Sequence, residues 1–117
     1  MMLKMYLFAF LVYHVFAAPV SDLVKSMPLT ETFNVTFKMY SGYLPIPGGK
    51  GKSLHYFFAE SQSSPSTDPI GLWLNGGPGC SSMDGALMEN GPFFFADEKL
   101  EIFVNPHSWN MLSLIHI

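Results

Sequence analysis

The chain has 117 residues, of which 49% are hydrophobic and only 13% are charged. A chain of this length forms at most one small domain, and its apolar composition is not that of a disordered polyelectrolyte. Its net charge is −3 and its six basic residues are all lysines, so it offers neither a basic stripe nor a guanidinium group for nucleic-acid recognition. The single cysteine excludes an internal disulfide and a multi-cysteine metal site made by this chain alone.

The first residues have the pattern of a leader peptide. Lys4 precedes an apolar run from 5 to 16, and Val15 and Ala17 suit the −3 and −1 positions of a signal peptidase site. As a helix this run would rise about 18 Å, which is short for a hydrocarbon core of about 30 Å and disfavours a membrane anchor. We expect residues 1–17 to be a secretory signal peptide, whose removal leaves an acidic product with no membrane segment in an oxidising compartment.

A β-hairpin is predicted after a lead-in that has no clear period. Apolar and polar residues alternate from 33 to 39, which is the pattern of a strand with one buried face, and residues 40–43 prolong it. Prolines and glycines between 45 and 51 interrupt the pattern, and residues 53–60 resume it. The sequon at Asn34 lies on the polar face of the first strand, so we expect a glycan there in a secreted protein.

The second half of the chain alternates short apolar runs with turn residues. A loop rich in serine and proline at 61–69 leads to the apolar run 70–74, whose pattern predicts a central strand covered on both faces. After a glycine-rich loop, the expected elements are a short helix at 83–90, a Gly91-Pro92 stop, and a hairpin of strands at 93–95 and 102–104.

The loop from 75 to 82 is the most specific feature, because glycines directly after a buried strand let backbone N–H groups approach a ligand. It lacks the ending of a phosphate-binding loop, and Ser82 stands where a dinucleotide fingerprint needs glycine. An oxyanion-hole loop fits the spacing, as does a tight turn without a ligand. Since no Gly-x-Ser-x-Gly nucleophile motif occurs, Ser81 and Ser82 are interpreted as capping or packing residues.

Three other residue types allow both a functional and a structural interpretation. Cys80 could act as a thiolate beside His55 or His107, although a lone cysteine in a secreted protein more often forms a disulfide. Glu89 lies near a predicted helix C-terminus, where a negative charge is mildly unfavourable, so both a functional carboxylate and a solvated surface residue fit this position. No two histidines have a metal-ligand spacing, so neither a metal nor another cofactor is expected.

The stretch Leu72-Trp73-Leu74-Asn75-Gly76-Gly77-Pro78-Gly79-Cys80-Ser81-Ser82 resembles the hallmark of the serine carboxypeptidases, the secreted and lysosomal enzymes that include cathepsin A. Flanking segments that resemble family motifs in the family's order are 40–44, 54–62, 89–93 and 105–110. The resemblance covers roughly residues 33–110. It implies an α/β fold, namely the N-terminal portion of an α/β-hydrolase with β-hairpins, a central strand, an oxyanion loop and a short helix.

The same resemblance implies an activity and a compartment. It predicts a serine-type carboxypeptidase that removes C-terminal residues from peptides through an acyl-enzyme, best at acidic pH and without a cofactor. The expected partner is the C-terminus of a peptide substrate, and the expected location is extracellular or lysosomal. The part of the family domain present here would be residues 18–110.

Individual roles also follow from the resemblance alone. Gly77 would supply an oxyanion-hole N–H, Asn75 would bind the terminal carboxylate of the substrate, and Glu89 would support that recognition through a hydrogen bond shared with a second acid further along the family's chain. The residues that would shape the pocket or pair with a distant cysteine are Trp73, Gly76 and Cys80.

The sequence also departs from the family. The nucleophile of these enzymes lies in a Gly-Glu-Ser-Tyr-Ala-Gly elbow, followed by the catalytic Asp and His, and none of these occurs here. Residues 111–117 differ from the family's Leu-Tyr-Leu-Glu-Ser-Pro strand. We therefore expect an N-terminal fragment that is inactive by itself and has a non-native end at 111–117. The alternative is a secreted, non-catalytic binding module or inhibitor. A stop codon after Ile117 would favour this alternative, whereas a longer reading frame that continues to the elbow would favour the fragment.

Overall fold

The computed structural model describes residues 18–27, 34–96 and 101–117, so the expected signal peptide lies outside the described residues. No described helix is long and apolar enough to cross a membrane. The elements in chain order are the 3-10 helix η1 (Val20–Asp22), strands β1 (Met39–Pro45), β2 (Ser53–Ala59) and β3 (Ile70–Trp73), the short helix α1 (Ser82–Asp84), the π-helical turn η3 (Gly85–Glu89), strands β4 (Phe93–Ala96) and β5 (Glu101–Val104), the 3-10 turn η4 (Trp109–Met111) and strand β6 (Ser113–His116).

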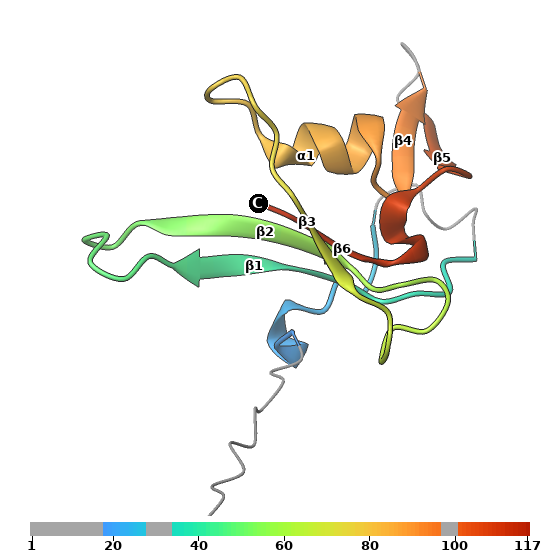
Figure 1. Ribbon diagram of the computed structural model, residues 1–117, viewed down its shortest axis with the longest axis horizontal. Helices are drawn as coiled ribbons and strands as arrows, with labels where there is room; N and C mark the ends of the chain where they lie inside the picture. The colour runs from blue at the N-terminus through green and yellow to red at the C-terminus, as the bar shows by residue number, and fades with distance from the viewer. Residues whose placement is uncertain (1–17, 28–33, 97–100) are drawn as a thin grey trace, which may run out of the picture.

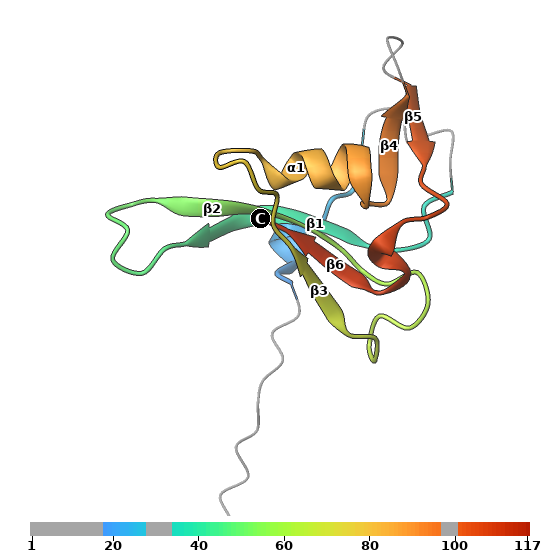
Figure 2. The same cartoon turned by 45° about the horizontal axis from the view of Figure 1, so that its top comes forward.

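The first expected hairpin is present as β1 and β2, which pair antiparallel along their whole length. Its turn needs residues that tolerate positive φ, and Gly48 and Gly51 adopt φ values of 73° and 86°. In Figures 1 and 2 this hairpin extends well beyond the rest of the sheet.

The predicted start of the first strand is wrong. Residues 34–38 are not a strand, and β1 begins at Met39; Phe33 lies outside the described residues. The alternation was nevertheless informative, because Val35 and Phe37 pack against the core while Asn34 and Thr36 are exposed. An extended segment can bury every second side chain without a strand partner, and β2 has already ended at Ala59 where this segment would need one.

The main sheet has the strand order β1-β2-β6-β3, in which β6 is antiparallel to β2 and parallel to β3 (Figure 2). The expectation that residues 70–74 form a central strand is therefore wrong for this chain. β3 is an edge strand whose Ile70 and Leu72 are 66% and 59% exposed. A continuous apolar run indicates that both faces of a strand need to be covered. It does not indicate which other segments of the fold cover them.

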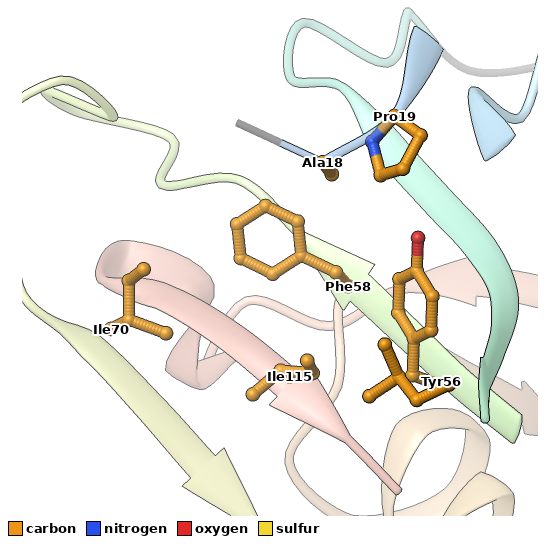
Figure 3. Close-up of a pocket in the computed structure, with 7 residues that line it drawn as sticks. Ala18, Pro19, Tyr56, Phe58, Ile70 and Ile115 are labelled. Carbon is orange, nitrogen blue, oxygen red and sulfur yellow. The ribbon is translucent and has the colours of Figure 1, made fainter. Parts of the chain in front are cut away.

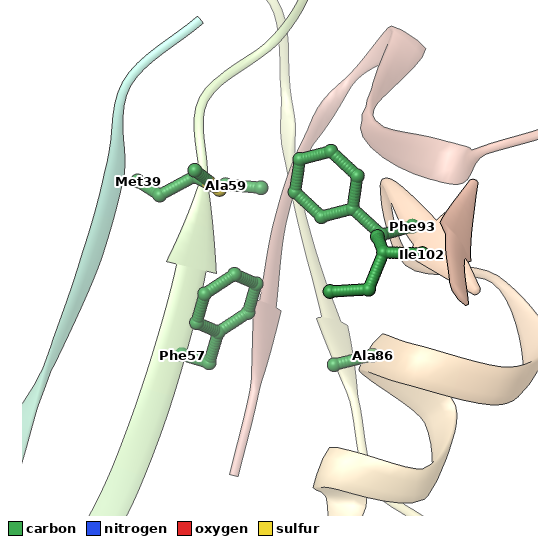
Figure 4. Close-up of a cluster of buried hydrophobic side chains, with 6 residues drawn as sticks. All are labelled: Met39, Phe57, Ala59, Ala86, Phe93 and Ile102. Atoms are coloured by element: carbon green, nitrogen blue, oxygen red, sulfur yellow. The ribbon is translucent and has the colours of Figure 1, made fainter. Parts of the chain in front are cut away.

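The core lies between one face of the sheet, the short helix and the second hairpin (Figure 4). The expected helix at 83–90 and hairpin of β4 and β5 are both present, although most of the helix is a π-turn. The helix lies above the sheet in Figure 1, and the hairpin stands beyond its end. The buried side chains that meet there are Met39, Phe57, Ala59, Ala86, Phe93 and Ile102.

The opposite face of the sheet is apolar and only partly covered. The N-terminal segment crosses β1 and β2 there, held by a hydrogen bond of 2.7 Å from the Tyr56 hydroxyl to the Asp22 carboxylate. Burial, together with this carboxylate partner, raises the pKa of Tyr56 to about 12. Beside it lies a hollow of about 360 Å³, bounded by Pro19, Phe58 and Ile115 among others (Figure 3).

Strand β6 holds a titratable side chain at the centre of the sheet. His116 is 1% exposed, and within the part of the chain that the structure describes neither ring nitrogen makes a hydrogen bond. Burial lowers the pKa of this imidazole to about 4 and outweighs the smaller, opposite effect of the nearby Ser82 backbone, so the ring is neutral above that pH. Buried polar atoms in native proteins are nearly always hydrogen-bonded, so an unpaired imidazole is unusual in a strand inside a sheet. The expectation that residues 111–117 are non-native stays a prediction, to be checked by reading the transcript across these codons.

We expect β3 to be weakly protected in the isolated chain. Its only neighbour among the described residues is β6, and it exposes apolar side chains along an unpaired edge, which promotes self-association. Hydrogen exchange followed by mass spectrometry should show faster exchange in β3 than in β2, whose two edges are paired. Cooperative protection of residues 70–74 in a soluble monomer would contradict this expectation.

Candidate functional site

The site begins where β3 ends and the chain enters the glycine-rich loop. Gly77 and Gly79 have φ values of 128° and 92°, a region that side chains rarely adopt, and the peptide bond between Gly77 and Pro78 is cis. The loop is exposed, and in Figure 1 it projects from the end of β3 before the chain returns into α1. Gly77 is exposed, and among the described residues none accepts a hydrogen bond from its N–H.

A chain of side-chain hydrogen bonds links the strand, the loop and the helix. The Trp73 indole Nε1 donates to Asn75 Oδ1 at 2.8 Å, and Asn75 Nδ2 donates to Glu89 Oε1 at 3.3 Å. The indole N–H can only donate and the carboxylate oxygen accepts, so together they fix the orientation of the Asn75 amide, with Oδ1 toward Trp73 and Nδ2 toward Glu89. Nδ2 carries two hydrogens, and among the described residues only Glu89 accepts a hydrogen bond from it.

The backbone on either side of the loop is held by two serines. The backbone N–H of Asn75 donates to Ser82 Oγ at 3.1 Å, and Ser82 is buried. Ser81 caps the helix, because its Oγ accepts a hydrogen bond of 3.2 Å from the backbone N–H of Met83. The interpretation of both serines as capping or packing residues is confirmed.

The far end of the helix is held just as closely. The backbone N–H groups of Asn90 and Gly91 both donate to the carbonyl oxygen of Gly85, at 3.0 and 3.1 Å. The Asn105 amide donates to the carbonyl oxygens of Glu89 and Gly91. These contacts fix the backbone that carries Glu89, whose exposed carboxylate then reaches back to the loop.

The structure brings together three of the residues singled out in the sequence, Trp73, Asn75 and Glu89. Gly76 lies in the same loop, with open space where a side chain would stand. Cys80 is exposed and its thiol is free. Outside this cluster, Asn34 is exposed on the segment before β1, as a glycosylation site requires.

The alternative of a cysteine nucleophile activated by histidine finds no support in the geometry. His55 lies on β2, where Nε2 is hydrogen-bonded to Ser41 Oγ at 2.9 Å and the ring packs edge-on against Tyr43. His107 is exposed in the loop after β5. In the ranges that the structure describes, no hydrogen bond joins either histidine to Cys80.

Two residues of the site escaped the sequence analysis. Trp109 packs edge-on against Trp73, with ring centroids 5.3 Å apart, and supports the indole that orients Asn75. Gly85 lies directly against the Trp73–Asn75 pair. A glycine early in a helix is the one signal that could have pointed to such close packing.

Comparison with known proteins identifies the family. The family model described as serine carboxypeptidase matches residues 28–116, which is most of the chain. The chain belongs to the serine carboxypeptidase family. Its expected α/β fold and its membership of this hydrolase family are confirmed.

Curated serine carboxypeptidases and a solved structure support this identification. Serine carboxypeptidase-like 20 of Arabidopsis thaliana is 45% identical over 97% of this chain, and the lysosomal protective protein of Mus musculus is 43% identical over 83% of it. The crystal structure of KEX1(ΔP), a prohormone-processing carboxypeptidase from Saccharomyces cerevisiae, is 34% identical, covers 68% of this chain and gives a TM-score of 0.51.

The chain spans only a small part of these proteins. It covers 24% of the Arabidopsis relative, 20% of the mouse relative and 18% of the yeast chain of known structure. The fold described above therefore corresponds to one portion of a much larger serine carboxypeptidase domain.

Proposed function

We propose that this segment forms the part of a serine carboxypeptidase that recognises the free C-terminal carboxylate of a peptide. The observation that carries the proposal is the hydrogen-bond chain from Trp73 through Asn75 to Glu89. It holds the Asn75 amide in one orientation, and the second N–H of Nδ2, which no described residue accepts, is the donor that we assign to the carboxylate. A hydrogen bond from that N–H to a carboxylate is charge-assisted and therefore stronger than one to a neutral acceptor.

Gly77 is suited to the chemical step. When a serine oxygen attacks the last peptide carbonyl, the carbonyl oxygen becomes an anion that needs preorganised donors. The exposed Gly77 lies in the loop that also carries Asn75, two residues away, and none of the described residues accepts a hydrogen bond from its N–H. A substrate anchored by its carboxylate at Asn75 would bring its last peptide bond to this donor, which explains specificity for the C-terminal residue.

The remaining steps need groups from the rest of the family's domain. The attacking serine forms an ester with the acyl part of the peptide, the C-terminal amino acid leaves with a proton on its nitrogen, and water then hydrolyses the ester. The second acid with which the family resemblance pairs Glu89 would also come from that remainder. The acidic pH optimum remains an expectation from the family resemblance.

The test is a full-length chain that carries residues 18–110 of this sequence followed by the remainder of the family's domain. It should hydrolyse an N-blocked dipeptide with a free carboxylate at about pH 5 and act poorly on the corresponding C-terminal amide. Binding of the dipeptide without turnover would instead support the non-catalytic binding module. Equal hydrolysis of acid and amide would contradict carboxylate recognition.

We further propose passage through the secretory pathway, followed by an extracellular or lysosomal location. Expressed in a secretory host, the chain should lose about 17 residues and carry a glycan on Asn34, which is exposed. Intact-mass spectrometry before and after enzymatic removal of N-glycans measures both changes, with Asn34→Gln as the control for the glycan. A secreted product that retains Met1 would contradict the signal peptide.

A further inference from the structure

The one residue that touches both Trp73 and Asn75 without a side chain of its own is Gly85. A Cβ atom built at Gly85 would lie 2.4 Å from Trp73 Nε1 and 2.6 Å from Asn75 Oδ1, the two atoms of the hydrogen bond that orients the amide. Separations this short are not accommodated without movement of one of the atoms. We propose that Gly85 is a positioning residue for recognition of the C-terminal carboxylate, an inference that rests on the proposed function.

Backbone conformation does not explain the glycine. Gly85 has φ −60° and ψ −42°, an ordinary right-handed helical conformation that any residue adopts. Alanine is the better helix former at such a position, so a glycine lowers the intrinsic stability of the helix. What the glycine provides is close approach of the helix to the Trp73–Asn75 pair.

Gly85 also fixes the opposite end of the helix. Its carbonyl oxygen accepts the hydrogen bonds from the Asn90 and Gly91 N–H groups that close the π-turn after Glu89. Turns of this kind are rare and occur frequently at functional sites. One residue therefore sets both the position of the Asn75 amide and the end of the turn that carries Glu89, whose carboxylate accepts from that amide.

A substitution at Gly85 should disturb the site more than the fold. The atoms that a methyl group would meet at Gly85 belong to the side chains of Trp73 and Asn75. At Gly91, by contrast, a Cβ would lie 1.9 Å from the Ala86 carbonyl oxygen, which is backbone and cannot move without distorting the helix. Gly85→Ala is thus the informative variant, whereas Gly91→Ala is expected to destabilise the fold.

The experiment uses the full-length chain described above and compares an N-blocked dipeptide with its C-terminal amide. Gly85→Ala should lower kcat/KM for the free acid by about 10- to 100-fold, as small misplacements of binding groups do, and change it little for the amide. Met88→Ala is the matched control, because this side chain of the same turn is 68% exposed and should leave the ratio unchanged. In the Asn75→Ala background, Gly85→Ala should lower the ratio no further.

The outcomes separate the inference from the proposed function. An unsubstituted chain inactive on both substrates overturns the proposed function and this inference with it. An active chain whose acid-to-amide ratio is unaffected by Gly85→Ala, or in which the effects of Gly85→Ala and Asn75→Ala add, overturns the inference alone. If Gly85→Ala does not fold, adding Trp73→Phe and Asn75→Ala together removes Trp73 Nε1 and Asn75 Oδ1, the two atoms nearest the new methyl group, and should restore folding; failure to do so contradicts the proposed contact.

Discussion

We expect the 117-residue chain itself to release no amino acid from an N-blocked dipeptide between about pH 4 and 7. A single oxyanion-hole donor such as Gly77 contributes roughly 3 to 4 kcal/mol to the transition state, and enzymes that lack one member of a triad can retain about a thousandfold acceleration over water. That residual acceleration requires a substrate held in a formed pocket. Here the sequence has no serine elbow, and the loop that carries Asn75 and Gly77 is open to solvent.

The measurement is release of the free C-terminal amino acid, followed by chromatography over hours at several pH values. The full-length chain that carries residues 18–110 serves as the positive control under the same conditions. The same chain with its elbow serine replaced by alanine gives the background. Turnover by the 117-residue chain above that background would overturn the interpretation of this sequence as an inactive portion of the enzyme.

Local features of the site could be predicted from the sequence because they depend on near neighbours. The Ser81 cap, the end of the helix at Gly91 and the turn formed by residues 75–80 all follow from residue types whose hydrogen bonding or φ preference is intrinsic. The two hairpins followed in the same way from alternation and turn residues. The contact of Asn75 with Glu89 needed more, since only the family resemblance related two side chains fourteen positions apart.

Features that depend on distant parts of the chain could not be predicted in this way. Residues 70–74 have the composition of a strand covered on both faces, yet β3 is an edge strand here. The apolar pattern indicates that such a strand needs covering segments, but it does not identify those segments. The π-turn at η3 and the contact of Gly85 with Trp73 depend on how closely the helix approaches the loop. Helical spacing in a short segment contains no information on that distance.

Replacing Asn75 by alanine in the full-length chain should lower kcat/KM for a peptide with a free C-terminal carboxylate by about 10- to 100-fold. The estimate corresponds to the loss of one hydrogen bond to a charged group, worth about 1.5 to 3 kcal/mol. The same substitution should leave hydrolysis of the C-terminal amide or ester within about threefold, because Gly77 and the reacting groups remain in place. Selectivity for the acid therefore falls while the chemical step is preserved.

Two controls make this result specific to the Asn75 amide. Gln62→Ala removes another side-chain amide, whose Nε2 donates a hydrogen bond of 2.7 Å to Asn110 Oδ1 and not to a residue of the loop. This substitution should leave the ratio of acid to amide hydrolysis unchanged. Trp73→Phe removes the indole donor that holds Asn75 Oδ1, so it should shift the ratio in the same direction as Asn75→Ala. If Asn75→Ala instead lowers kcat/KM equally for the acid and the amide, the residue supports the loop as a whole and does not bind the carboxylate.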